Sequence, residues 1–152
     1  MRTLPTVAVI GAGAMGGAMA QCLTGAGYSV WVRDVSPDRE KRLQAQGLKI
    51  AGSPAEAAMQ SRVIFIVVVD QEQIEEVLWG QTQAASNVLP GLLANLGSEH
   101  TVFFNSTIAP EDVARFCQAV AATGAKAVDA PISGGPGRAA AGTMSMMLPR
   151  LP

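Results

Sequence analysis

Short apolar stretches alternate along this chain with longer stretches that mix apolar and polar residues. The short stretches are rich in β-branched residues and lie at 6–10, 29–34, 48–51, 63–69, 101–105 and 126–130. Runs of this length and composition are typical of buried β-strands. The stretch from Val63 to Val69 contains no polar residue, which predicts a central parallel strand covered on both faces.

The longer stretches predict helices at 15–25, 37–46, 54–59, 71–79 and 110–123. Ser36 and Pro37 fit a helix start, because serine caps free N–H groups and proline suits the first helical turn. Ser53 and Pro54 open the next helix in the same way.

The remaining segments carry weaker signals. A loop is expected at 80–87 and one or two helical turns at 90–96. Residues 134–142 are rich in glycine, and 144–148 predict a last strand. His100, the only histidine, precedes a strand and is expected at the surface.

Strands that alternate with helices imply right-handed crossovers and a mainly parallel sheet. The sequence therefore predicts an α/β fold, doubly wound, with helices on both faces of the sheet. No linker, repeat or low-complexity tract interrupts the pattern, so residues 1–152 are expected to form a single domain.

Composition narrows the function classes. Hydrophobic residues make up 49% of the chain, and the net charge is −1. This balance argues against a nucleic-acid partner, and no apolar run approaches the roughly 18 residues of a membrane span. Cys22 and Cys117 lie far apart, which indicates buried reduced thiols, as in a cytoplasmic protein.

The low share of charged residues, 15% against about 25% in an average soluble domain, has two interpretations. One is an apolar face that meets another domain or subunit. The other is an ordinary α/β domain rich in alanine and glycine.

A glycine-rich turn connects the first predicted strand to the first helix. Gly11, Gly13 and Gly16 fit the pattern G-x-G-x-x-G, which in this strand–helix context is typical of a Rossmann-type dinucleotide-binding fold. The first glycine permits a tight turn, the second admits a pyrophosphate, and the third lets the helix approach the sheet. The helix N-terminus then offers N–H groups to the phosphates. We assign to cofactor binding Gly11, Gly13, Ala14, Met15 and Gly16.

The end of the second strand bears on cofactor choice. Asp34 lies 23 residues after Gly11, close to the position of the acid that binds the adenosine ribose. A carboxylate there would repel a 2′-phosphate, so Asp34 favours NAD over NADP. Arg33 is the alternative, because an arginine can hold that phosphate. Adjacent strand residues point to opposite faces, so only one of the two is expected to face the ribose.

Further stretches match in order along nearly the whole chain: 9–20, 67–70, 77–80, 105–110 and 129–135, the last followed by Ala139, Gly142 and Thr143. Together with the glycine turn they resemble the β-hydroxyacid dehydrogenase family, which includes 3-hydroxyisobutyrate, tartronate semialdehyde and threonate dehydrogenases. The run Ser133-Gly134-Gly135 also resembles 6-phosphogluconate dehydrogenase. The resemblance implies hydride transfer between a nicotinamide and a small hydroxy acid.

The resemblance also implies roles for residues beyond the glycine turn. It assigns to the cofactor Val68, Val69, Asp70, Ser106 and Thr107. Ser106 or Thr107 would also suit the start of the helix at 110–123, and the two roles are compatible.

The resemblance assigns Ser133, Gly134 and Gly135 to the substrate. They follow a strand, and their backbone N–H groups beside a hydroxyl suit a carboxylate. The alternative interpretation of this segment is a flexible surface loop.

The chain departs from the family pattern at its end. Family members continue with a helical domain that carries the catalytic lysine, whereas Lys41, Lys49 and Lys126 lie outside that motif. We therefore assign no catalytic residue and expect little dehydrogenase activity from this chain alone. A non-catalytic dinucleotide-binding module is the alternative function. Without the helical domain an apolar face is expected to be exposed, which favours a homo-oligomer.

Overall fold

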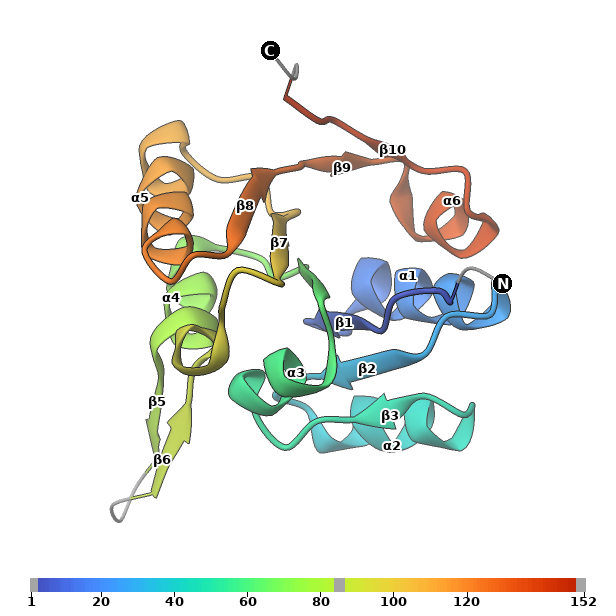
Figure 1. Ribbon diagram of the computed structural model, residues 1–152. Coiled ribbons are helices and arrows are strands. Elements are labelled where there is room, and N and C mark those ends of the chain that lie inside the picture. Colours follow the sequence, from blue (N-terminus) through green and yellow to red (C-terminus); the bar gives the residue numbers. More distant parts are fainter. Residues whose placement is uncertain (1–2, 84–86, 150–152) are drawn as a thin grey trace.

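The computed structural model describes residues 3–83 and 87–149. Its main sheet has six strands in the order β3-β2-β1-β4-β7-β8, and every neighbouring pair is parallel (Figure 1). The predicted doubly wound Rossmann-type fold is thus confirmed. The six strands are β1 (Val7–Ile10), β2 (Val30–Arg33), β3 (Lys49–Ile50), β4 (Val63–Ile66), β7 (Thr101–Phe104) and β8 (Lys126–Asp129).

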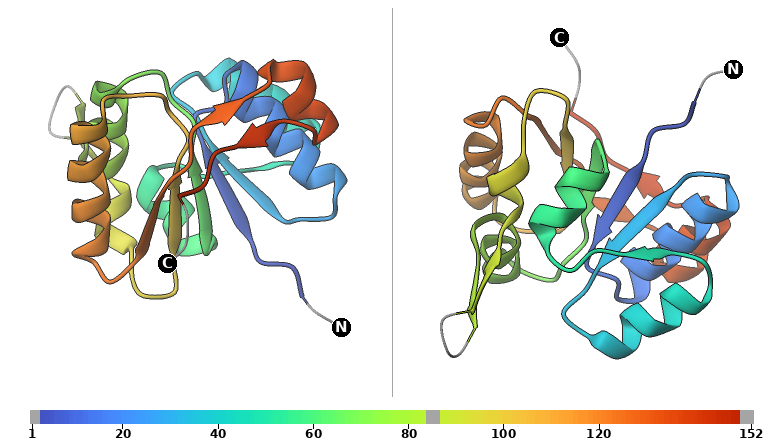
Figure 2. Two further views of the ribbon diagram at one scale, coloured as in Figure 1. Left: turned by 90° about the horizontal axis from the view of Figure 1, so that it is seen from above. Right: turned by 60° about the horizontal axis from the view of Figure 1, so that its bottom comes forward.

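Helices cover both faces of this sheet (Figure 2). On one face lie α3 (Pro54–Gln60), α4 (Gln71–Trp79), α5 (Pro110–Ala121) and the 3₁₀ helix η1 (Leu92–Asn95). On the other lie α1 (Ala14–Gly25) and α2 (Pro37–Ala45), and α6 (Gly135–Ala141) packs against α1. Within the described ranges, no helix is long and apolar enough to cross a bilayer.

The capping serines expected from the sequence are present. The N–H of Arg39 donates to Ser36 Oγ at 3.4 Å at the start of α2. The N–H of Glu56 donates to Ser53 Oγ at 3.1 Å at the start of α3. Each hydroxyl satisfies an N–H group that the helix itself leaves without a partner.

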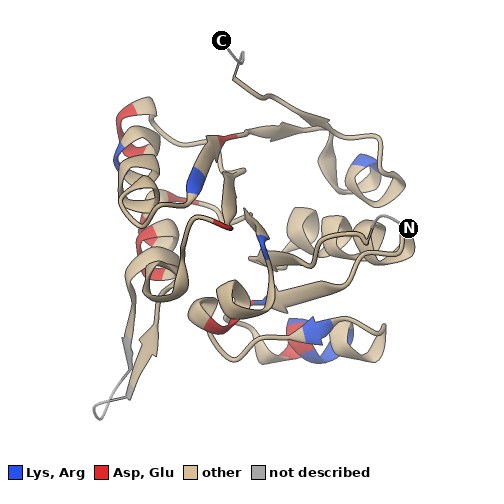
Figure 3. Ribbon diagram, viewed as in Figure 1, with Lys and Arg blue, Asp and Glu red and all other residues tan. Residues whose placement is uncertain are grey.

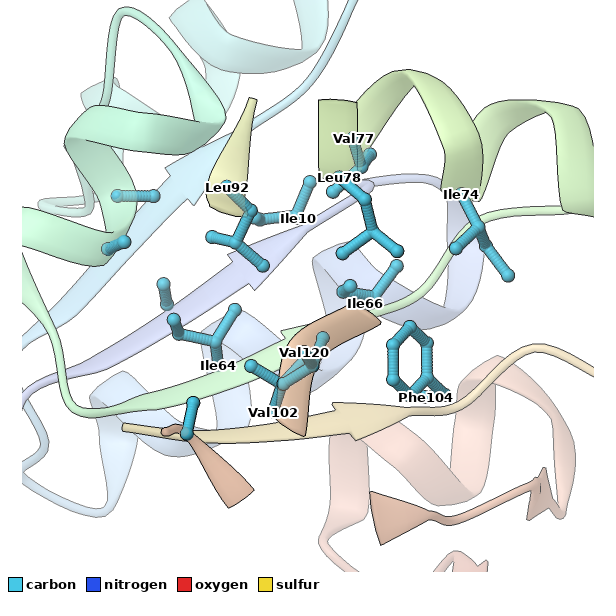
Figure 4. Close-up of a cluster of buried hydrophobic side chains, with 14 of the residues drawn as sticks. Ile10, Ile64, Ile66, Ile74, Val77, Leu78, Leu92, Val102, Phe104 and Val120 are labelled. Carbon is cyan, nitrogen blue, oxygen red and sulfur yellow. The ribbon is translucent and has the colours of Figure 1, made fainter. Parts of the chain in front are cut away.

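The larger of two hydrophobic clusters lies between the sheet and α3, α4 and α5 (Figure 4). Alternate residues of the central strands point into it, and they are fully buried: Ile64, Ile66, Val102 and Phe104. Burying side chains of this size stabilises the fold by about 1.5–3 kcal/mol each. This cluster fixes the two central strands against the helices that line the site described below.

The expectation that Val63–Val69 is covered on both faces is wrong in part. The strand ends at Ile66, and Val63 and Phe65 are only half-buried. Phe65 stacks on Phe103 with ring centroids 5.0 Å apart. On this face α1 and α2 pack against β1, β2 and β3, so β4 and β7 receive less cover from them.

The expected loop at 80–87 is also wrong in part. Gly80–Gln83 forms β5 and Asn87–Pro90 forms β6, and the two strands pair antiparallel. Residues 84–86 lie outside the described residues. Gly80 has φ +96°, and a Cβ there would lie 2.4 Å from Leu89 O. The base of this hairpin therefore depends on the absence of a side chain at Gly80.

The glycine-rich segment at 134–142 is mostly helical. It follows the short strand β9 (Ile132–Ser133), and it forms α6 before β10 (Ser145–Met146) pairs antiparallel with β9. The sequence predicted a strand at 144–148 and missed the helix, because glycine lowers intrinsic helix propensity. Packing of α6 against α1 provides tertiary contacts that propensity does not include.

The two cysteines are free and partly buried, in agreement with reduced thiols. Burial raises the pKa of the Cys117 thiol, and the negative charge of Asp129 raises it further. A raised thiol pKa lowers the thiolate fraction and hence the reactivity of the sulfur.

His100 is not a surface residue, contrary to expectation. It is 4% exposed, its Nδ1 accepts from the N–H of Gly97 at 2.9 Å, and its Nε2 lies 2.9 Å from Ala58 O. Because Nδ1 accepts, the ring proton lies on Nε2, which donates to Ala58 O. The imidazole thus joins α3 to the turn before β7.

Replacing His100 by leucine removes both bonds, so the N–H of Gly97 loses this acceptor and Ala58 O keeps only the N–H of Ser61, at 3.4 Å. We expect His100→Leu to lower the free energy of unfolding by about 1–3 kcal/mol, measured by urea denaturation. The control is Lys126→Gln on the exposed surface of β8, which should change that free energy by less than about 0.5 kcal/mol. Equal stability of the two variants would contradict a structural role for His100.

Candidate functional site

The site lies where the strand order of the sheet reverses. From β1 the chain proceeds to β2 and β3 on one side, whereas β4 leads to β7 and β8 on the other. The strands β1 and β4 are neighbours, and the N–H of Val67 donates to Ile10 O at 2.8 Å just beyond them. In open α/β sheets, ligands bind at the carboxyl ends of strands at such a switch point.

Two glycines allow the backbone to pack closely at this point. Gly11 has φ +93°, and a Cβ there would lie 2.2 Å from Val67 O. A Cβ on Gly16 would lie 1.8 Å from Gly11 O. The tight turn expected at Gly11 and the close helix packing expected at Gly16 are therefore both present.

Gly13 differs from these two glycines, because a Cβ there would meet no protein atom within 4 Å. It is the N-cap residue of α1, and no side chain caps this helix. The first turn contains no acidic residue, and α1 carries no charged residue at all (Figure 3). The N–H groups of that turn and the positive end of the helix dipole thus face open space.

A cavity of about 650 Å³ opens in front of this turn. Its volume falls in the range of about 300–1,000 Å³ that is usual for small-molecule sites. The wall combines the glycine turn, the end of β2, the segment after β4, and parts of α4 and the β5–β6 hairpin. The lining residues include Gly11, Gly13, Ala14, Arg33, Asp34, Val35, Arg39, Val67, Val68, Val69, Gln73, Glu76, Gln81 and Leu89.

Asp34 connects the glycine turn to the end of β2. Its Oδ2 accepts from the N–H of Ala12 at 2.7 Å, and its Oδ1 accepts from the N–H of Ser36 at 2.8 Å. Arg39 Nη1 lies 3.5 Å from Oδ1. Asp34 is 6% exposed, and backbone donors on two sides fix the position of its carboxylate.

Both Arg33 and Asp34 line the cavity, so the alternation of adjacent strand residues does not keep either of them away from it. The reason is local: β2 ends at Arg33, and the chain has already turned at Asp34. The Arg33 guanidinium pairs with Glu40, with Nη1 3.2 Å from Oε1.

Seven of the cofactor residues expected from the sequence line the cavity: Gly11, Gly13, Ala14, Arg33, Asp34, Val68 and Val69. Five do not: Met15, Gly16, Asp70, Ser106 and Thr107. Asp70 instead caps α4, where its Oδ1 accepts from the N–H of Gln73 at 2.9 Å.

Ser106 does not line the cavity but supports a residue of its wall. Its hydroxyl donates to Val68 O at 2.6 Å, so it joins the end of β7 to a lining residue beyond β4. It does not cap α5, whose N-cap is Ala109 with no side-chain bond. Thr107 is exposed.

Asn105 makes a similar connection to the end of β8. Its Nδ2 donates to Ala130 O at 2.7 Å. Among the described residues, its Oδ1 is buried without a hydrogen-bond partner. Together Asn105 and Ser106 hold the carboxyl ends of β4, β7 and β8 in register.

The segment expected to bind substrate lies beyond β8. Ser133 ends β9, Gly134 has φ +125°, and Gly135 begins α6 with φ +73°. None of the three lines the cavity. The three residues are exposed, and they form the junction of the strand β9 and the helix α6.

Sequence reasoning missed several lining residues. The side chain of Gln73 is uncharged, and its Oε1 accepts a hydrogen bond from the N–H of Val69 at 3.1 Å. Gln81 and Leu89 belong to the hairpin that was expected to be a loop. The hairpin residues have no local sequence signal, because their contribution depends on how the hairpin meets the rest of the cavity wall, whereas the bond from Val69 to Gln73 spans only four residues.

Comparison with known proteins gives consistent matches. The family model of the NAD-binding domain of 6-phosphogluconate dehydrogenase matches residues 6–149. The L-threonate dehydrogenase of Cupriavidus necator is 37% identical over 141 residues, which are 93% of this chain and 45% of that protein.

Two solved structures agree with this result. The 3-hydroxyisobutyrate dehydrogenase of Salmonella typhimurium superimposes with a TM-score of 0.81 and 30% identity, covering 94% of this chain and 47% of that one. Psf3 in complex with NADP⁺ superimposes with a TM-score of 0.83 and 31% identity, covering 94% of this chain and 48% of that one. The chain therefore spans less than half the length of the relatives it matches.

The close packing at Gly16 can be tested by adding one methyl group. We expect Gly16→Ala to lower the free energy of unfolding by about 3 kcal/mol, since the new atom overlaps Gly11 O and the turn has to move. Gly25→Ala, at the other end of α1, is the matched control, because a Cβ there meets no protein atom within 4 Å. It should stabilise the chain by up to about 1 kcal/mol. The free energies of both variants are measured by thermal or urea unfolding, and a Gly16→Ala variant as stable as the wild-type chain would refute the packing argument.

Proposed function

Because this chain belongs to the family of the NAD-binding domain of 6-phosphogluconate dehydrogenase, we propose that its cavity binds NAD as the cofactor half of a 3-hydroxyacid dehydrogenase. The whole protein would transfer a hydride between the nicotinamide and a small hydroxy acid. The names of the relatives, which act on L-threonate and 3-hydroxyisobutyrate, support this substrate class.

One observation carries the proposal for the cofactor. The uncapped N-terminus of α1 faces a cavity at the switch point, and Gly13 leaves the approach to its N–H groups open. A pyrophosphate fits this arrangement, because backbone donors and the helix dipole both favour negative charge. Gly11, Gly13 and Ala14 would bind the phosphates, with Met15 and Gly16 supplying N–H groups of the first turn.

Asp34 would bind the adenosine ribose. Its two oxygens already accept from Ala12 and Ser36, but a carboxylate has about four lone-pair sites, which leaves room for ribose hydroxyls. A 2′-phosphate would meet this carboxylate at close range. We therefore propose a preference for NAD, although the relative Psf3 is found with NADP⁺.

The nicotinamide half would lie along the segment after β4. Val68 and Val69 line the cavity there, Asp70 fixes the start of α4, and Ser106 holds Val68 O. Ser106 and Thr107 follow β7 at the same edge of the sheet. These residues would orient the nicotinamide, which supplies the hydride chemistry when the cofactor is bound.

Ser133, Gly134 and Gly135 would hold the substrate carboxylate. They follow β8 through β9. Asn105, which directly precedes Ser106 at the end of β7, ties this edge to the end of β8 through Ala130 O. A substrate held there would keep a constant position relative to the cofactor. The two free cysteines favour a cytoplasmic location. Exposed apolar side chains outside the cavity, such as Met59 and Trp79, favour a homo-oligomer.

A second function, that of a non-catalytic dinucleotide-binding module, has one observation in its favour. Among the described residues, the cavity wall contains neither a lysine, the residue type that the family resemblance implies as general acid and base, nor a histidine. Removing such a group typically costs about 10²–10⁴ in rate. Under both functions the chain binds the dinucleotide.

Cofactor binding is tested by fluorescence titration of the purified chain with NADH and NADPH. We expect saturable binding of both, with NADH the tighter. Gly13→Ala should weaken NADH binding about tenfold or more, because its methyl group would occupy the path of the pyrophosphate. Its cost in unfolding free energy should stay within about 2 kcal/mol, as for an altered N-cap.

The control for this titration is Gly25→Ala, which should keep the wild-type affinity. Absence of NADH binding by the wild-type chain would overturn the proposed function. Tighter binding of NADPH than of NADH would overturn the assignment of Asp34 and transfer the ribose site to Arg33.

Catalysis is tested by following NADH formation from NAD with L-threonate or 3-hydroxyisobutyrate. We expect the 152-residue chain to be slower than a whole relative by at least about 10², because neither a lysine nor a histidine lines the cavity among the described residues. Activity equal to that of a whole relative would show that the chain contains its own general acid or base. Recovery of activity when a separate helical domain is added would favour the dehydrogenase over the non-catalytic module.

A further inference from the structure

Four charged side chains meet at the turn between β2 and α2: Arg33, Asp34, Arg39 and Glu40. Figure 3 shows both signs side by side on α2. Arg33, Asp34 and Arg39 line the cavity, whereas Glu40 lies outside its wall. Glu40 can therefore influence a ligand in the cavity only through its charge or through the neighbours that it holds.

A single oxygen of Glu40 holds two of these neighbours. Its Oε1 accepts from the backbone N–H of Asp34 at 3.0 Å and from Arg33 Nη1 at 3.2 Å. The side chains of Arg33 and Glu40 are only 17% and 15% exposed. Water screens a pair at this depth less than a pair on the open surface, so the attraction is retained.

This contact decides whether Arg33 is available to an anion. A 2′-phosphate on the ribose would have to compete with Glu40 for the guanidinium. It would also add negative charge beside two carboxylates, Asp34 and Glu40. NAD has hydroxyls in the same place and meets neither cost.

We propose that Glu40 is a positioning residue that sets the preference for NAD by withholding Arg33 from a 2′-phosphate. This inference rests on the proposed function and deepens it. It differs from the role of Asp34, because Glu40 does not line the cavity and acts through the arginine it holds.

Arg39 does not account for the same effect. Its side chain is 46% exposed, and its Nη1 lies 3.5 Å from Asp34 Oδ1. It has no bond to Glu40 among the contacts of the described residues. A change at Glu40 therefore alters the partner of Arg33 and leaves that of Arg39 in place.

The decisive variant is Glu40→Gln. Glutamine keeps an oxygen that can accept from the N–H of Asp34, but it lacks the charge that holds Arg33. We expect the ratio of NADPH affinity to NADH affinity to rise about tenfold, mainly through tighter NADPH binding. This change corresponds to the gain of one charge-assisted hydrogen bond.

Two further variants test whether the change in the affinity ratio depends on Arg33 or on the loss of any negative charge from α2. Asp38→Asn removes the same charge from the exposed first turn of α2, and it should leave the ratio within about twofold. In Arg33→Gln/Glu40→Gln the tenfold gain should disappear. Melting temperatures of all variants establish that each is folded.

The outcomes distinguish this inference from the proposed function. Saturable NADH binding with an unchanged ratio in Glu40→Gln would overturn the inference alone. A gain that persists without Arg33, or that Asp38→Asn reproduces, would also overturn it. Failure of the wild-type chain to bind either dinucleotide would overturn the proposed function and this inference with it.

Discussion

The close backbone contact between the first glycine turn and the end of β4 is the constraint on which the site depends. Gly11 lies against Val67 O, and Gly16 lies against Gly11 O, at separations that leave no room for a Cβ. Because α1 starts immediately after this contact, its N-terminus has to open toward the crevice between β1 and β4. The same contact keeps the segment after β4 in the cavity wall. Dinucleotide recognition therefore begins with packing of the main chain.

The second organising feature is a chain of hydrogen bonds between polar side chains and the backbone at the carboxyl edge of the sheet. Asp34 ties the end of β2 to the glycine turn, Ser106 ties β7 to the segment after β4, and Asn105 ties β7 to β8. Each bond joins segments that are distant in sequence. A site that is built in this way is held in place before a ligand arrives, which reduces the ordering cost of binding.

Three features of the structure could not be predicted from local sequence signals: the burial of His100, the helix α6 and the exposure of both Arg33 and Asp34 to the cavity. His100 is polar and follows an exposed turn, yet its ring bonds to Ala58, 42 residues away. The helix α6 forms in a segment of poor helix propensity because it packs against α1. Both Arg33 and Asp34 reach the cavity because β2 ends one residue earlier than the strand pattern indicated. For His100 and α6 the missing information was the identity of a distant partner, whereas for Arg33 and Asp34 it was the turn of the chain directly after β2.

The sequence by itself determined the order of the six strands of the parallel sheet and of the helices α1 to α5, and the position of the glycine turn. These features follow from periodicity and from the conformational freedom of glycine, which act over a few residues. The hairpin in the cavity wall and the pairing of Arg33 with Glu40 were decided only by the tertiary structure. The direction of each strand-end side chain was decided there as well. These features depend on which surfaces come into contact when the helices pack on the sheet, and a local sequence pattern does not contain that information.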